Sequence, residues 1–237
     1  MKRMPVSARL AQLQAEYRLP DGTAARFEQL LAALAAEDDP HTTISDPAAA
    51  VDQHIADSLS ALEVEAVREA HSLVDIGAGA GFPGLALAIA LPEARVDLVE
   101  SARRKCAVIE RLALAASLTN ARALPVRAEE WAASDGRDAY ELATARAVAP
   151  LTVLVEYAAP LLKLGGSLVA WKGARDPAEE GAGAAAAEIV GLRSIDVLHA
   201  TPFPGAIDLN LHLYLKDRET PDRFPRRPGA AAKRPLG

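Results

Sequence analysis

The sequence contains a single cysteine, few aromatic residues and no long apolar run. One thiol, that of Cys106, excludes an internal disulfide and a cysteine metal cluster, so we expect no metal site. No apolar stretch approaches the roughly 20 residues that a membrane-spanning helix needs. Residues 1–5 lead into a polar amphipathic pattern rather than the apolar core of a signal peptide. These absences predict a cytoplasmic protein with neither a membrane nor a metal partner.

The chain is acidic overall, but its charge is unevenly distributed. Residues 223–237 contain five basic side chains and no acid, and subtracting those five charges from the net charge of −6 leaves −11 on residues 1–222. A basic tail rich in proline and glycine is either a solvated end or a site that holds phosphate. Aromatic residues make up only 4% of the chain, which argues against a row of rings that stacks on bases. The basic side chains of the tail are Arg223, Arg226, Arg227, Lys233 and Arg234.

Strands alternate with helices from residue 72 onward. Such alternation requires parallel strands joined by right-handed crossovers. The last two strands have no helix between them, so we expect them to pair antiparallel. The sequence therefore predicts an α/β, Rossmann-like fold with a seven-stranded, mostly parallel sheet. The predicted strands lie near 72–76, 95–100, 121–126, 140–145, 165–171, 192–199 and 209–216, and the predicted helices near 83–91, 102–117, 150–162 and 177–190.

Helices are also predicted before the first strand, over 7–18, over 24–37 and from Asp46-Pro47 onward, where the aspartate has the chemistry of a helix cap. His54 and Asp57 lie three residues apart on one face of that last helix. They form either a surface hydrogen-bonded pair or a polar pair that faces a ligand cleft. We expect a helical part of residues 1–62, a Rossmann-like domain of residues 63–222 and a basic tail of residues 223–237.

A glycine-rich turn connects the first predicted strand to an apolar helix. Glycine suits a backbone with positive φ or a close approach to a ligand, and a helix start offers free N–H groups. The spacing also matches the G-x-G-x-x-G signature of dinucleotide-binding proteins. However, the match starts two residues after the first glycine that follows the strand. The strand also ends in an acid, whose carboxylate would crowd a pyrophosphate. The turn resembles the S-adenosylmethionine (SAM) turn of class I methyltransferases, in which an acid such as Glu100 accepts the ribose hydroxyls. It contains Asp75, Gly77, Gly79, Gly81 and Phe82.

Polar residues also follow the third, fourth and fifth strands, at the edge of the sheet where a ligand site must lie. After the third strand, Ala128 and Glu129 could meet an adenine edge, or their segment could be a solvated turn. Arg146 interrupts an apolar segment, so it either closes a structural ion pair or contacts a ligand. Lys172 is either an ordinary surface lysine or a phosphate contact.

These motifs, in this order, resemble the RsmG (GidB) family of methyltransferases. The Gly-Phe-Pro-Gly end of the turn and the Pro-Arg-Arg-Pro-Gly sequence of the tail are the most specific parts of the resemblance. It implies a class I fold and SAM-dependent methylation of N7 of a single guanine, at position 527, in 16S ribosomal RNA. It also implies a monomer whose partner is 16S rRNA, in the small ribosomal subunit or an assembly intermediate. The segments that carry the resemblance are 54–58, 75–84, 127–130, 146–150, 172–173 and 224–229.

Methylation at guanine N7 needs no general base, because N7 has a free lone pair and loses no proton. We therefore expect Arg146 to position the reactants rather than to move a proton. The cofactor is expected to contact Asp75, Gly77, Gly79, Gly81, Phe82, Glu100, Ala128, Glu129 and Arg146. The substrate RNA is expected to contact Lys172, Arg223, Arg226, Arg227 and Lys233.

Three alternatives stay open from the sequence. They are a methyltransferase that acts on a small molecule or a protein, a dinucleotide-dependent oxidoreductase, and an RNA-binding protein that retains SAM without turnover. The basic tail favours RNA, because a small substrate would not require five clustered cations. Since the tail follows the last strand, its substitution is expected to leave SAM affinity almost unchanged.

Overall fold

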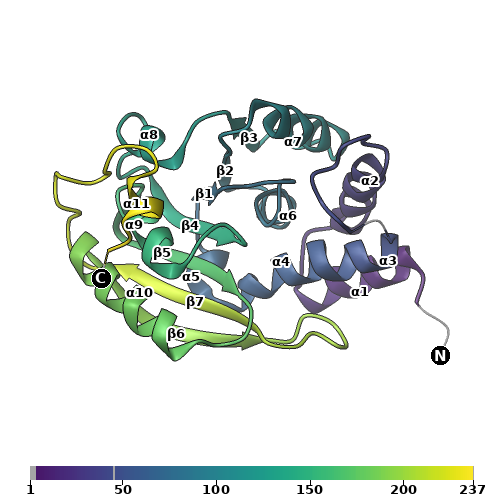
Figure 1. Cartoon of the computed structure of the whole chain (residues 1–237). Helices are drawn as coiled ribbons and strands as arrows, with labels where there is room; N and C mark the ends of the chain where they lie inside the picture. Colours follow the sequence, from purple (N-terminus) through teal and green to yellow (C-terminus); the bar gives the residue numbers. More distant parts are fainter. Residues whose placement is uncertain (1–3, 45, 237) are drawn as a thin grey trace.

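The computed structural model describes residues 4–44 and 46–236, and a seven-stranded sheet forms its centre (Figure 1). The strand order is β3-β2-β1-β4-β5-β7-β6. The first five strands are parallel, and β7 runs antiparallel to both β5 and β6. This confirms the predicted mostly parallel α/β sheet with an antiparallel end. The strands are β1 (Ser72–Ile76), β2 (Arg95–Val99), β3 (Ala121–Leu124), β4 (Tyr140–Arg146), β5 (Leu162–Lys172), β6 (Leu192–Ala200) and β7 (Leu209–Lys216).

Helices cover both faces of the sheet, and each face has its own hydrophobic core (Figure 1). Every residue of β1 is buried, because this strand lies between the two layers. On one face lie α6 (Gly84–Ala90) and α7 (Arg103–Ala115). On the other lie α8 (Ala128–Ala132), α9 (Leu151–Ala158) and α10 (Pro177–Val190). A last short helix, α11 (Ala230–Lys233), packs against α9.

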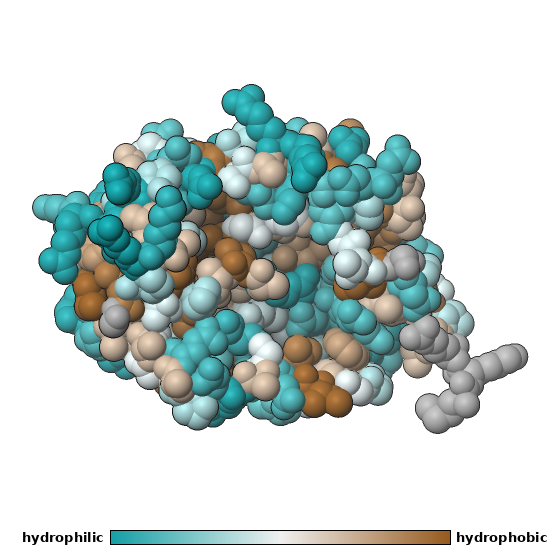
Figure 2. All heavy atoms as spheres, viewed as in Figure 1, coloured by the Kyte–Doolittle hydropathy of each residue, from teal (hydrophilic) through white to brown (hydrophobic). Residues whose placement is uncertain are grey.

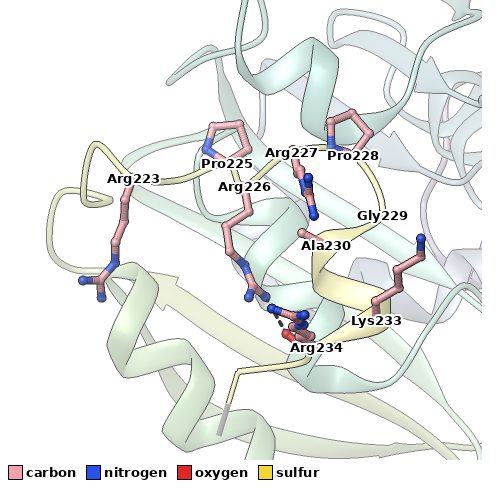
Figure 3. Close-up of a pocket in the computed structure, with 9 residues that line it drawn as sticks. All are labelled: Arg223, Pro225, Arg226, Arg227, Pro228, Gly229, Ala230, Lys233 and Arg234. Carbon is pink, nitrogen blue, oxygen red and sulfur yellow. Dashed lines mark hydrogen bonds between the residues drawn. The ribbon is translucent and has the colours of Figure 1, made fainter.

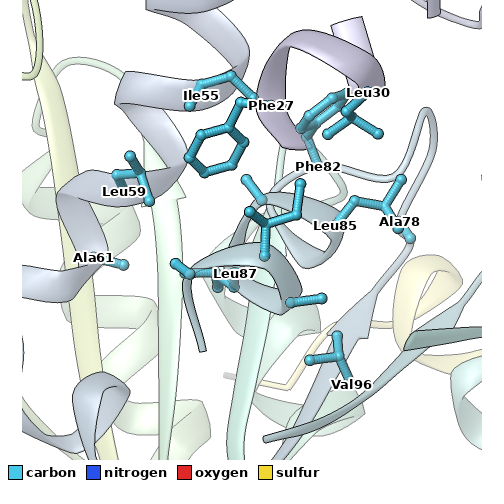
Figure 4. Close-up of a cluster of buried hydrophobic side chains, with 14 of the residues drawn as sticks. Phe27, Leu30, Ile55, Leu59, Ala61, Ala78, Phe82, Leu85, Leu87 and Val96 are labelled. Carbon is cyan, nitrogen blue, oxygen red and sulfur yellow. The ribbon is translucent and has the colours of Figure 1, made fainter. Parts of the chain in front are cut away.

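The N-terminal helices pack onto the α6 and α7 layer and share its core. Phe27 and Leu30 lie close to Ile55, Phe82 and Leu85 in this cluster (Figure 4). The described helices contain none that is both long and apolar enough to cross a membrane. The N-terminal elements are α1 (Val6–Glu16), α2 (Thr23–Ala35), α3 (Pro47–Ala50), the π-helical η1 (Val51–Ala56), α4 (Asp57–Leu59), the 3₁₀-helical η2 (Ser60–Glu63) and α5 (Glu65–Arg68).

Two predicted elements differ from the structure. The helix expected over 150–162 ends at Ala158, because Pro160 cannot continue a helix. Strand β5 already begins at Leu162, because the apolar residues after Pro160 are compatible with a strand as well as with a helix. At 127–130, where a solvated turn was one of two alternatives, the structure has the start of α8. There the side chain of Glu130 accepts from the backbone N–H of Arg127, the residue before the helix, which is half of a capping box. The division of the chain at residues 62 and 222 stays a prediction.

Candidate functional site

Two pockets open on either side of one loop, residues 147–149, which joins β4 to α9 and contributes to both walls. The loop lies where the strand order reverses between β1 and β4, which is where open α/β sheets bind ligands. The first, which we call the turn pocket, has a volume of about 360 Å³ and is lined by residues that include Gly77, Glu100, Ala128, Glu129, Tyr157 and Ala232. The second, the Arg146 pocket, has a volume of about 520 Å³ and is lined by residues that include Asp57, Arg146, Pro150, Trp171, Lys172 and Leu209.

The glycine turn holds its three glycines in the left-handed region, with φ of +67° at Gly77, +59° at Gly79 and +95° at Gly81. A Cβ atom at Gly77 would lie 2.8 Å from Cγ2 of Val148, so glycine is needed for the loop to approach the turn. A Cβ atom at Gly79 would meet only the carbonyl oxygen of Gly77, at 3.8 Å. Gly77 therefore serves packing, whereas Gly79 faces open space.

Asp75 supports the turn from beneath, where its side chain is buried. One carboxylate oxygen accepts from the N–H of Gly84 at 2.9 Å, and the other accepts from the Thr144 hydroxyl at 2.9 Å. Burial raises the pKa of Asp75 to about 6, against the lowering effects of these two hydrogen bonds and of Arg146. Gly81 and Phe82 are buried as well. Their cofactor contacts stay predictions, since the walls of the turn pocket come from other residues.

The Asp75 carboxyl is expected to make stability depend on pH. Its pKa is higher in the folded chain than the ordinary 3.8, so it stabilises the fold below about pH 4, and that contribution is lost as pH rises through 6. In Asp75→Asn this loss, on the order of 3 kcal/mol for two pKa units, should be absent. Urea unfolding of both proteins between pH 4 and 7 measures the difference, and parallel curves would contradict it.

Glu100 directly follows β2 and joins the turn to the start of α7. Its Oε2 accepts from the N–H of Gly79 at 3.2 Å, and its Oε1 accepts from the N–H of Ala102 at 2.9 Å. The Lys105 ammonium lies 3.8 Å from Oε2. Each carboxylate oxygen has two lone pairs, so Glu100 can still accept from a ligand in the turn pocket.

Glu129 also lines the turn pocket and has a partner that the sequence did not reveal. Its Oε1 accepts from the backbone N–H of Gly229, in the C-terminal tail, at 2.7 Å. Ala232 of the same tail lines the pocket. Glu129 was predicted from the sequence as a site residue, whereas the part of the tail in this pocket was not.

Arg146 and Asp57 form an ion pair in the wall of the Arg146 pocket, with Nη1 and Oδ2 2.6 Å apart. Asp57 is only 7% exposed, and burial raises the pKa of its carboxyl while Arg146 opposes the rise. Its Oδ1 has no hydrogen-bond partner within the described residues. Trp171 Nε1 donates to the Asp57 carbonyl at 3.1 Å, which fixes this helix against β5. Arg146 thus closes the ion pair that was one of the two sequence interpretations, and it lines a pocket, while its contact with a ligand stays a prediction.

His54 is buried and stacks on Phe82, with ring centroids 4.4 Å apart. Its Nε2 lies 3.2 Å from the Thr42 hydroxyl. Burial, with a contribution from Arg146, lowers the pKa of His54 to about 4, so the imidazole is neutral at pH 7. The π-helical turn η1 carries His54 into the interior, and such turns often occur at functional sites. His54 and Asp57 are thus interior residues rather than a surface pair, and of the two only Asp57 is among the residues that line the Arg146 pocket.

Lys172 ends β5 and forms an ion pair with Glu179 of α10 at 2.7 Å. Glu179 also accepts from the N–H of Leu151, so it connects α10 to the start of α9. Lys172 is only partly exposed, and its ammonium lies in the wall of the Arg146 pocket. Its role as an RNA contact stays a prediction.

The C-terminal tail is folded onto the domain, which excludes the solvated end. Phe224 is 2% exposed and belongs to the core beneath α9. The guanidinium of Arg226 pairs with both carboxylate oxygens of Glu156, which is 2% exposed. Glu156 was missed, although a lone acid in the apolar sequence of α9 signals a buried partner. Arg226 therefore anchors the tail, and its predicted RNA contact would have to share this guanidinium.

No group of three or more His, Cys, Asp or Glu side chains that could hold a metal occurs within residues 4–44 and 46–236.

Known structures share this fold at low sequence identity. A mutant of MtNAS, described in complex with S-adenosylmethionine, matches with a TM-score of 0.56 and 15% identity over 88% of this chain and 78% of that one. The Methanococcus jannaschii fibrillarin pre-rRNA processing protein matches with a TM-score of 0.53 and 17% identity over 66% of this chain and 70% of that one. These similarities establish the class I methyltransferase fold.

Sequence comparisons are more specific. The family described as rRNA small subunit methyltransferase G (GidB) matches residues 24–201. The ribosomal RNA small subunit methyltransferase G of Rubrobacter xylanophilus is 42% identical over 192 residues, which cover 78% of this chain and 72% of the relative. That of Chloroflexus aggregans is 42% identical over 196 residues, 82% of each chain. The chain therefore belongs to the rRNA small subunit methyltransferase G family.

Proposed function

We propose that this protein uses SAM to methylate N7 of a single guanine in 16S rRNA. The observation that carries the proposal is the pair of pockets that share the wall of residues 147–149 at the switch point of the sheet. Ligands in the two pockets would be neighbours at this loop, and transfer requires the methyl group of the donor and the base to come into direct contact. Membership of the family supports rRNA as the substrate.

The turn pocket fits the nucleoside part of SAM. Its volume of about 360 Å³ lies within the range of small-molecule sites, and Glu100 offers acceptors for ribose hydroxyls. Ala128 and Glu129 line the wall where an adenine edge would lie, and Gly77 and Gly79 leave backbone exposed beside it. When bound, SAM supplies a methyl group on a sulfonium.

The residues of the Arg146 pocket would hold the guanine and exclude water. Guanine N7 loses no proton, so the pocket needs no base, and its one described carboxylate, that of Asp57, is paired with Arg146. Arg146 has further N–H donors for the methionine carboxylate of the cofactor or for the base. The contribution expected of these residues is alignment of N7 behind the methyl group.

We propose that the protein acts as a cytoplasmic monomer on the small subunit or its assembly intermediate. The tail provides cations for the RNA backbone. Arg227 and Lys233 are exposed and have no ion pair with any residue in the described ranges, unlike Arg226. Figure 2 shows hydrophilic side chains over the region where Figure 1 places the tail. An otherwise acidic body needs such a local site to attract RNA.

Removal of these two exposed cations should weaken RNA binding and flatten its salt dependence. Each phosphate contact contributes roughly 0.7 to 0.9 to the slope of log affinity against log salt, so Arg227→Ala/Lys233→Ala should lower the slope by about 1.5. The charge-matched control is Arg26→Ala/Lys163→Ala, two exposed cations outside the tail. Titration of an rRNA fragment at several salt concentrations measures both slopes. If the tail variant kept the wild-type slope, the phosphate contacts would lie elsewhere.

The reaction itself is tested by mass mapping of 16S rRNA from cells with and without this protein. We expect one 7-methylguanine to disappear and to return when the wild-type gene is restored. Methylation of a small molecule or protein, with rRNA unchanged, would refute the proposal.

A further inference from the structure

The inner face of the C-terminal tail, residues 223–236, forms part of the turn pocket. The N–H of Gly229 donates to Glu129 Oε1 at 2.7 Å, and Ala232 lines the pocket beside it. Gly229 has a φ of +78°, which directs the chain from the loop into α11. A ligand in the turn pocket therefore contacts a wall that exists only while the tail is docked.

The outer face of the same tail forms another pocket, which we call the basic pocket and which has a volume of about 760 Å³ (Figure 3). Its described walls carry no acidic side chain. Arg226 and Arg234 lie next to each other, with Arg226 donating to the Arg234 carbonyl at 2.9 Å, whereas Arg223 lies apart (Figure 3). Its cations are Arg223, Arg226, Arg227, Lys233 and Arg234.

A small set of contacts holds the tail in this position. Phe224 and Ala231 are buried at 2% and 1% exposure, and Arg226 pairs with Glu156. The Arg137 guanidinium donates to the Phe224 carbonyl at 2.9 Å. These contacts hold a segment that contributes residues to both the turn pocket and the basic pocket, so either ligand would stabilise the same docked arrangement.

We propose that the tail couples the two pockets, so that a phosphodiester in the basic pocket and the nucleoside of the cofactor in the turn pocket bind with positive cooperativity. The identity of the two ligands rests on the proposed function. The tail is docked by contacts within the chain, and each ligand would further favour this docked state, so the second ligand binds to a wall that the first has stabilised. This differs from the expectation that substitution of a tail beyond the last strand leaves SAM affinity almost unchanged.

Calorimetry with S-adenosylhomocysteine (SAH) and a short oligouridylate tests the coupling. The oligouridylate carries phosphodiesters but no guanine, so it cannot act through the base site. For the wild type we expect it to lower the Kd of SAH about fivefold, and SAH to lower the Kd of oligouridylate by the same factor. In Arg227→Ala/Lys233→Ala the enhancement should be lost, and in the control Arg26→Ala/Lys163→Ala it should persist.

A second variant addresses the inner face. Ala232 is exposed at the pocket wall, so Ala232→Leu should fold and should weaken SAH binding about tenfold by overpacking, with oligouridylate binding retained. An SAH affinity that is the same with and without bound oligouridylate overturns the coupling, as does a wild type that does not bind oligouridylate. The proposed function is tested separately by rRNA methylation. Coupling without methylation would refute that function alone, and methylation without coupling would refute this inference alone.

Discussion

Replacement of Gly79 by valine is expected to abolish SAM binding while the sheet stays folded. A Cβ atom at this position has no neighbour closer than 3.8 Å, so the new side chain would project into the space above the turn, where we propose that the cofactor lies. The N–H of Gly79 also donates to Glu100, which lines the turn pocket. A β-branched residue at φ +59° is strained, on the order of 1 to 3 kcal/mol. Calorimetry with SAH and thermal unfolding measure the two effects.

Gly22 provides a matched control for the strain. Gly22 has a φ of +84°, and no atom lies within 4 Å of the position that a Cβ atom would take. It directly precedes α2 and lines neither the turn pocket nor the Arg146 pocket. Gly22→Val should lose a similar amount of stability and keep the wild-type affinity for SAH. Wild-type affinity in Gly79→Val would place the cofactor elsewhere, and equal loss of affinity in both variants would attribute the effect to folding.

Most of the fold could be predicted because its signals are local. The apolar runs give strand positions, and β1 and β7 have the predicted bounds. The missing helix between the last two strands predicted their antiparallel pairing. The boundary of α9 could not be predicted, because the apolar residues that follow Pro160 are compatible with helix and strand alike.

The site was predictable only where a residue type is tied to backbone geometry. The turn glycines have the positive φ that their sequence requires. The expected cofactor contact of Asp75 stays a prediction, but the protein partners of its two oxygens could not be predicted, one of them being Thr144, 69 positions away in the sequence. The contact between Glu129 and Gly229 spans 100 positions and leaves no local pattern. Such partners are set by the packing of distant segments, which one sequence does not contain.

The joint replacement of Arg146 and Asp57 should separate their structural role from their role in the reaction. Arg146→Ala alone leaves the buried Asp57 carboxylate without its cation, which costs on the order of 3 kcal/mol. Arg146→Ala/Asp57→Asn removes both charges, so we expect most of this stability to return. Methyl transfer should stay roughly 100-fold below wild type in both variants, because the group that aligns the reactants is missing. Thermal unfolding and transfer of labelled methyl groups from SAM to rRNA measure the two quantities.

A structural ion pair outside the pockets gives the comparison that this experiment needs. The Arg122 guanidinium lies 2.6 Å from the carboxylate of Asp97, which is 0% exposed. Neither residue lines the turn pocket or the Arg146 pocket. Arg122→Ala should lose stability and keep most of its methyl transfer at a temperature where it is folded. If the double variant at Arg146 and Asp57 recovered activity together with stability, Arg146 would be a structural residue only. Alignment of guanine N7 would then depend on the remaining wall of the pocket, formed by Trp171, Lys172 and the loop of residues 147–149.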